Sequence, residues 1–104
     1  MKTRWTAAML LLLPLAASVH AQGQDALYTR SLAATCAACH GTDGRVVGDA
    51  GVAALAGQPR ETLATQLRGF KAGTRPSTVM GQLSKGFSET QIDQLAGYFS
   101  ALKP

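Results

Sequence analysis

Two cysteines and a histidine stand within five residues, in Cys36-Ala37-Ala38-Cys39-His40, and this motif constrains the chain more than any other feature. Such spacing occurs in three kinds of site: a redox-active disulfide, part of a zinc site, and the attachment site of a c-type haem. The choice among these three chemistries depends on the rest of the sequence.

The first 21 residues have the pattern of a secretory signal peptide. Lys2 and Arg4 precede an apolar run at residues 7–17, and small residues leading up to Ala21 suit cleavage after that position. The run is shorter than the roughly 20 residues of a membrane-spanning helix, and an uncleaved membrane anchor is the alternative. We therefore predict that residues 1–21 are a cleaved signal peptide and that the protein is periplasmic.

The mature chain, residues 22–104, is predicted to be one small domain. Its net charge falls from +4 to +2, because Lys2 and Arg4 are lost and all six acidic residues stay. It has no basic run interleaved with aromatic residues, which argues against nucleic acid as a partner. A chain this short is marginally stable with an apolar core alone, so we expect an additional staple.

The motif itself favours haem among the three chemistries. A zinc site needs four ligands, whereas the mature chain offers only Cys36, Cys39 and His40 as Cys or His ligands, all crowded together. A thioredoxin-like protein needs β-branched strands, and the mature chain has four valines and one isoleucine; this thiol–disulfide alternative stays open. Cysteines three apart lie on one side of a helical turn, where both can bond one porphyrin edge, and the next residue offers an imidazole to the iron.

Met80 is the candidate for the opposite side of the iron. It is the only methionine of the mature chain, which has no second histidine, although a lone methionine is ordinarily core filler. It lies in the stretch RPSTVMGQLSKG, where Pro76, Gly81 and Gly86 predict a loop that could carry the sulfur over the ring. A thioether opposite an imidazole raises the reduction potential.

The apolar pattern predicts an all-α fold with three main helices. The first is expected at residues 25–36. The second begins with Pro59 at its first position and ends at Gly73. The third begins at Ser88, which forms a capping box with Gln91. Apolar residues recur at helical spacing in the second and third helices: Leu63, Leu67, Phe70, Ile92, Leu95, Ala96, Phe99 and Leu102.

Several blocks of the sequence are similar to a known family. Residues 25–102, with LAGQP and LATQLRGFKAGTRP, resemble the class I c-type cytochromes. The block GFKAGTRPSTVMGQLSKGFSETQIDQLAGYF is similar to the cytochrome subunits of flavocytochrome c sulfide dehydrogenases. The resemblance implies three main helices around one covalent haem c, with Cys36 and Cys39 as thioethers, His40 as proximal ligand and Met80 as distal ligand.

The resemblance also implies a hydrogen bond to the proximal histidine. Relatives commonly have a proline shortly before LAGQ, and its carbonyl accepts the ring N–H of that histidine. Here Ala53 and Ala54 occupy this stretch. Any residue has a carbonyl, so we expect the same bond from a less rigid loop.

Five cations could line the haem edge, contact its propionates or dock a partner, and the alternative is that they are simply solvated. They are Arg45, Arg68, Lys71, Arg75 and Lys85. We choose Arg75 as the propionate candidate, because it opens the stretch that contains Met80.

The function expected from motif and resemblance is one-electron transfer rather than catalysis. As a cytochrome subunit, the chain would accept electrons from a flavoprotein sulfide dehydrogenase. The first alternative is a free-standing carrier that delivers electrons to a terminal oxidase or another respiratory partner. An enzyme or gas binder would need an open iron position, which a bond from Met80 would close.

Overall fold

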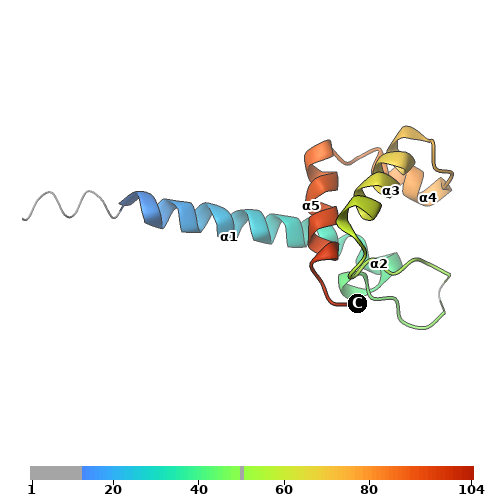
Figure 1. Cartoon of the computed structure of the whole chain (residues 1–104), viewed down its shortest axis with the longest axis horizontal. Helices are drawn as coiled ribbons and strands as arrows, with labels where there is room; N and C mark the ends of the chain where they lie inside the picture. Colours follow the sequence, from blue (N-terminus) through green and yellow to red (C-terminus); the bar gives the residue numbers. More distant parts are fainter. Residues whose placement is uncertain (1–12, 50) are drawn as a thin grey trace, which may run out of the picture.

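The computed structural model describes residues 13–49 and 51–104, and every regular element within them is helical (Figure 1). The all-α fold predicted from the sequence is confirmed. In chain order the elements are α1 (Leu13–Ala34), α2 (Ala37–His40), the 3₁₀ helix η1 (Thr42–Gly44), α3 (Arg60–Ala72), α4 (Thr78–Ser84) and α5 (Glu89–Ser100).

Helix α1 is longer at its start than predicted. It begins at Leu13 rather than near residue 25, and it ends at Ala34, two residues before Cys36. Figure 1 shows most of α1 extending away from the other helices, and its last turns packing against α5. The predicted cleavage after Ala21 falls within α1, and residues 1–12 of the predicted signal peptide lie outside the described residues. Of the helices in the described part of the chain, none combines the length and apolarity needed to cross a membrane.

Helix α3 follows the sequence prediction closely. Pro59 is its N-cap, with φ −57° and ψ 135°, rather than its first helical residue as predicted. Gly73 ends the helix in the left-handed region at φ 77°, as predicted, where a residue without Cβ has no steric penalty.

Helix α5 begins with the predicted capping box. The Ser88 side chain accepts a hydrogen bond from the Gln91 backbone at 3.1 Å, and the Ser88 backbone N–H donates to Gln91 Oε1 at 2.9 Å. The apolar face of α5 meets α3 and the end of α1 in a small core. Its buried residues are Ala33, Leu63, Ala64, Ile92, Leu95, Ala96 and Phe99.

The loop predicted around Met80 is wrong, because these residues form helix α4. Ser77 caps this helix: its hydroxyl accepts from the Met80 backbone N–H at 3.1 Å, and its carbonyl accepts from Gly81. A glycine inside a helix costs about 1 kcal/mol relative to alanine. The cap and the packing of α4 against α3 offset that cost.

Candidate haem site

The two cysteines lie on one helical turn. Cys36 is the N-cap of α2, and its carbonyl accepts the backbone N–H of His40 at 2.9 Å. Cys36 is partly buried and Cys39 is exposed. Burial raises the pKa of the Cys36 thiol.

His40 is buried, and its orientation is set by one strong hydrogen bond. Its Nδ1 lies 2.6 Å from the carbonyl oxygen of Ala53, which confirms the bond expected from this stretch of the sequence. A carbonyl oxygen can only accept, so Nδ1 carries the proton and Nε2 keeps its lone pair. This is the arrangement in which a histidine binds a metal while a second bond fixes its ring.

The turn after His40 is built on glycine. Gly41 has φ 80°, and a Cβ at this position would lie 2.0 Å from the carbonyl oxygen of Arg45. Gly44 has φ 70°, and a Cβ there would lie 2.7 Å from the Cβ of Leu55. Both glycines are therefore required for the chain to fold tightly behind the motif.

Met80 comes from a different element than the CAACH turn. It is partly buried in the first turn of α4, and its neighbour Val79 is 60% exposed. Figure 1 shows α4 near the end of α3 and α2 near its start. The structure thus brings Cys36, Cys39 and His40 together on one turn and carries Met80 on a separate helix at the other end of α3.

Arg75 is held against the end of α3. Its backbone N–H donates to the Gly69 carbonyl at 3.1 Å, and its guanidinium carbon lies 5.1 Å from the centre of the Phe70 ring. A Cβ on Gly69 would come within 3.1 Å of the Arg75 Cβ, so the glycine lets the chain return closely onto the helix.

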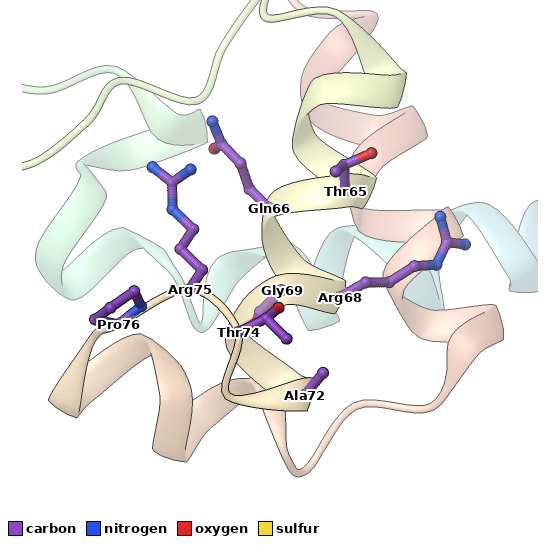
Figure 2. A pocket seen from close by; sticks show the side chains of 8 residues that line it. All are labelled: Thr65, Gln66, Arg68, Gly69, Ala72, Thr74, Arg75 and Pro76. Carbon is purple, nitrogen blue, oxygen red and sulfur yellow. The ribbon is translucent and has the colours of Figure 1, made fainter.

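A groove of about 570 Å³ lies beside Arg75 (Figure 2). In this view Gln66 and Arg75 project to one side of α3, whereas Thr65 and Arg68 project to the other. Gln66 is thus a second polar side chain on the face of Arg75, and the sequence analysis missed it. Nothing in the neighbouring sequence distinguishes Gln66 from any other polar residue of an amphipathic helix.

Three of the other four candidate cations are engaged by acceptors of the protein itself. The acceptors are Glu89 and Asp93 for Arg68, the Lys103 carbonyl for Arg45, and the Phe87 carbonyl for Lys71. The contacts from Arg68 are ion pairs of 2.8 and 2.7 Å between exposed side chains, where solvent screens the attraction. Lys85 is exposed.

Two further polar contacts near the site were missed from the sequence. Ser77, three residues before Met80, is a helix-capping signal that the flanking Pro76 and Gly81 obscured. The Tyr98 hydroxyl donates to Asp43 Oδ1 at 2.7 Å and joins segments 55 residues apart. No local sequence pattern predicts such a long-range pair.

The donor set fits haem c. Cys36 and Cys39 lie one turn apart for attachment, and His40 has a free Nε2 beside them. Met80 offers a soft thioether from α4. These four residues could hold the group, with Arg75 and Gln66 as polar side chains beyond them.

The chain is similar in sequence to several known cytochromes and electron acceptors. No protein-family model matches the chain. It is 47% identical over 72 residues to the thiosulfate dehydrogenase electron acceptor of Thiomonas intermedia, which covers 69% of this chain and 33% of that protein. It is 41% identical over 71 residues to the cytochrome subunit of sulfide dehydrogenase of Chlorobaculum tepidum, covering 68% of this chain and 63% of that one.

A third relative matches almost the whole chain. Cytochrome c4 of Azotobacter vinelandii is 36% identical over 105 residues, covering 92% of this chain and 49% of that protein. The chain therefore spans between one third and just under two thirds of the length of these relatives. These relatives are small class I c-type cytochromes, and the chain belongs to that family.

Proposed function

We propose that this protein binds one haem c covalently and transfers single electrons. The observation that carries the proposal is the CAACH turn: two thiols lie one turn apart, and the adjacent imidazole is held by Ala53 with its Nε2 free. Haem c, when bound, supplies an iron that cycles between two oxidation states.

Each donor residue has a distinct role in this proposal. Cys36 and Cys39 tether the group through thioether bonds, and His40 donates Nε2 to the iron. The Ala53 carbonyl keeps the imidazole oriented and raises its basicity. Met80 closes the other iron position, so that no substrate can coordinate and the protein acts as a carrier rather than an enzyme.

Arg75 is the proposed contact for the haem propionates, with Gln66 beside it. Its position against Gly69 and Phe70 limits the freedom that its side chain would lose on pairing with a carboxylate. Arg75→Gln should weaken this contact and lower the reduction potential modestly, because loss of a positive charge near the haem favours the oxidised iron. Arg68→Gln, which breaks ion pairs on the other side of α3, should leave the potential nearly unchanged. Equal effects of both changes would contradict the assignment.

Export to the periplasm is part of the proposal. It rests on the predicted signal peptide at residues 1–21. Intact mass and N-terminal sequencing of the protein from the periplasmic fraction should show a chain that begins at Gln22. A haem-loaded protein that keeps residues 1–21 would contradict this part.

The electron donor that we propose is a dehydrogenase of reduced sulfur compounds, with a flavoprotein sulfide dehydrogenase as first candidate. Two relatives are named for such partners, one for sulfide and one for thiosulfate dehydrogenase. A free-standing carrier that serves a terminal oxidase or another respiratory protein is the alternative.

The docking surface in this proposal is the exposed face of α4. Val79 and Leu83 are 60% and 52% exposed and line a groove of about 430 Å³. Between Glu61 and Glu89 the sequence has no acidic residue, so the chain on both sides of α4 is cationic or neutral. An apolar centre with a few charges at its rim is the usual anatomy of a protein interface.

Haem reduction by sulfide, with and without a flavoprotein from the same cell, tests this donor. Thiosulfate with thiosulfate dehydrogenase is the parallel arm. We expect a marked acceleration by one of the two dehydrogenases, because sulfide alone reduces a high-potential haem slowly. With a net charge of only +2, the rate should fall only modestly with salt.

A matched pair of variants locates the contact. Leu83→Glu should slow the accelerated reaction by about tenfold, the loss expected for a central apolar contact. Leu27→Glu makes the same change at a 67% exposed leucine on α1 and should have little effect. Reduction that neither dehydrogenase accelerates, together with fast exchange with an oxidase, would favour the free-standing carrier.

A further inference from the structure

The loop between the CAACH turn and α3 is anchored at both of its ends but not in the described part of its middle. Val47 is 89% exposed, and a Cβ on Gly48 or Gly51 would meet no atom within 4 Å. This part of the loop therefore has little protein packed against it. Ala53, whose carbonyl accepts from His40, follows directly and has no proline ring to fix its φ.

The two ends of the loop, at Gly44 and at residues 55–57, are bonded to each other and lie against the end of α5. The Gly44 carbonyl accepts the backbone N–H of Leu55 at 2.8 Å and that of Ala56 at 3.3 Å. The Gly57 N–H donates to the carbonyl of Phe99 at 2.9 Å. These bonds begin two residues after Ala53, so the position of Ala53 depends on where Gly44 and α5 are held.

Side chains also fix the start of the loop, at residues 43–45, to the C-terminal part of the chain. The Tyr98 hydroxyl donates to Asp43 Oδ1 at 2.7 Å, and Nε and Nη2 of Arg45 both donate to the Lys103 carbonyl, at 3.1 and 2.8 Å. Asp43 has φ 54°, a left-handed conformation that a non-glycine residue adopts at a cost. The bond from Tyr98 helps to offset that cost.

We infer that Tyr98 is a positioning residue for His40. Its bond to Asp43 holds the 43–45 turn against α5, and through Gly44 and Leu55 it keeps the Ala53 carbonyl on Nδ1 of His40. The inference rests on the proposed function, in which His40 binds the haem iron. A firm bond to Nδ1–H makes the imidazole a stronger donor and favours the oxidised iron, so a looser bond should raise the reduction potential.

Tyr98→Phe in the haem-loaded protein tests the inference, because it removes only the hydroxyl and keeps the edge-to-face contact with Phe99. We expect an upward shift of the reduction potential. We also expect about fivefold faster hydrogen exchange at the Leu55 and Ala56 amides. Losing one ordinary hydrogen bond makes local opening of these amides more frequent by about this factor.

Tyr28→Phe is the matched control. The Tyr28 hydroxyl accepts from Gln91 Nε2 at 2.8 Å, also on α5 but at its first turn. Tyr28→Phe should change neither the reduction potential nor the hydrogen exchange at Leu55 and Ala56. A potential that is unchanged in Tyr98→Phe would overturn the inference, as would equal shifts in both variants. If the wild-type spectrum lacks histidine ligation, the proposed function fails instead, so the two failures are distinguishable.

Discussion

The segment that carries His40 is held by contacts with distant residues, whereas the segment that carries Met80 is held largely by its neighbours. His40 bonds to Ala53, 13 residues away. The loop behind it bonds to Tyr98 of α5 and to Lys103 beyond that helix, through pairs 55 and 58 residues apart. Met80 lies on a helix of seven residues whose cap, Ser77, is three residues away. Packing against α3 is the main long-range support of that helix.

This difference bears on how the two iron ligands would be lost. The proximal side forms only when the whole domain is folded, because its contacts join residues 40–45 to Ala53 and to the C-terminal part of the chain. The distal side could open by local unfolding of α4 alone, which costs less free energy than global unfolding. We therefore expect the Met80 bond to be the weaker of the two.

The largest expected effect comes from removing the covalent attachment on the proximal side. Cys36→Ala/Cys39→Ala should lose most of its fixed structure, because the core cluster within the described residues has seven buried apolar side chains, three of them alanines. Circular dichroism should show a largely unfolded chain without cooperative melting. In wild type, haem should stay with the protein on acid–acetone extraction. A variant that melts like wild type would contradict this account of the core.

Removing the distal ligand should have a large but local effect. Met80→Ala should keep the haem and the helices, lower the reduction potential and lose the near-infrared band of sulfur bonded to ferric iron. The reduced variant should bind carbon monoxide rapidly. Val79→Ala, the adjacent change on α4, should keep the near-infrared band, leave the reduction potential unchanged and not react rapidly with carbon monoxide. If Met80→Ala unfolds the whole domain, the two sides are less independent than the comparison implies.

Two helix caps test the comparison at smaller amplitude. Ser77 and Ser88 each accept a backbone N–H at 3.1 Å, and removing either hydroxyl should cost about 1 kcal/mol. Ser77→Ala should make the near-infrared band disappear at lower denaturant than the helices. Ser88→Ala should destabilise the domain as a whole, so that band and helices are lost together. The same order of loss in both variants would mean that α4 does not open locally.

The smallest effect is expected in alkaline solution. The hydrogen bond to Asp43 raises the pKa of Tyr98 above its ordinary value of 10.0; burial adds to the shift, and Arg30 and Arg45 oppose it. A raised pKa in the folded state means that the stabilisation is complete below pH 10 and is lost as pH rises through the raised value. Denaturant midpoints should therefore fall above pH 10 in wild type and fall less in Tyr98→Phe. Parallel pH profiles would contradict this role of the bond.

Much of this organisation could be predicted because the signals are local. The capping box at Ser88, the end of α3 at Gly73 and the CAACH turn each depend on residues within a few positions of one another. The bond from His40 to Ala53 is not local, and it was expected only from the resemblance to a family.

What the sequence did not predict depends on competition between local signals or on distant contacts. Helix α4 was taken for a loop because Pro76, Gly81 and Gly86 were weighed above the cap at Ser77. Helix α1 begins 12 residues before the predicted start, because residues 1–21 are predicted to be a cleaved signal peptide and are left out of the predicted fold. The contact between Tyr98 and Asp43 exists only because the fold brings α5 over the motif.

The most direct test of the account is the ligation of the iron in the wild-type protein. Visible and near-infrared spectra should be recorded in the oxidised and reduced states, the latter with and without carbon monoxide. The account predicts a low-spin haem with the sulfur-to-iron band when oxidised and no rapid reaction with carbon monoxide when reduced. Rapid carbon monoxide binding by the reduced wild type, or absence of the band, would show that Met80 does not close the iron and would contradict the carrier function.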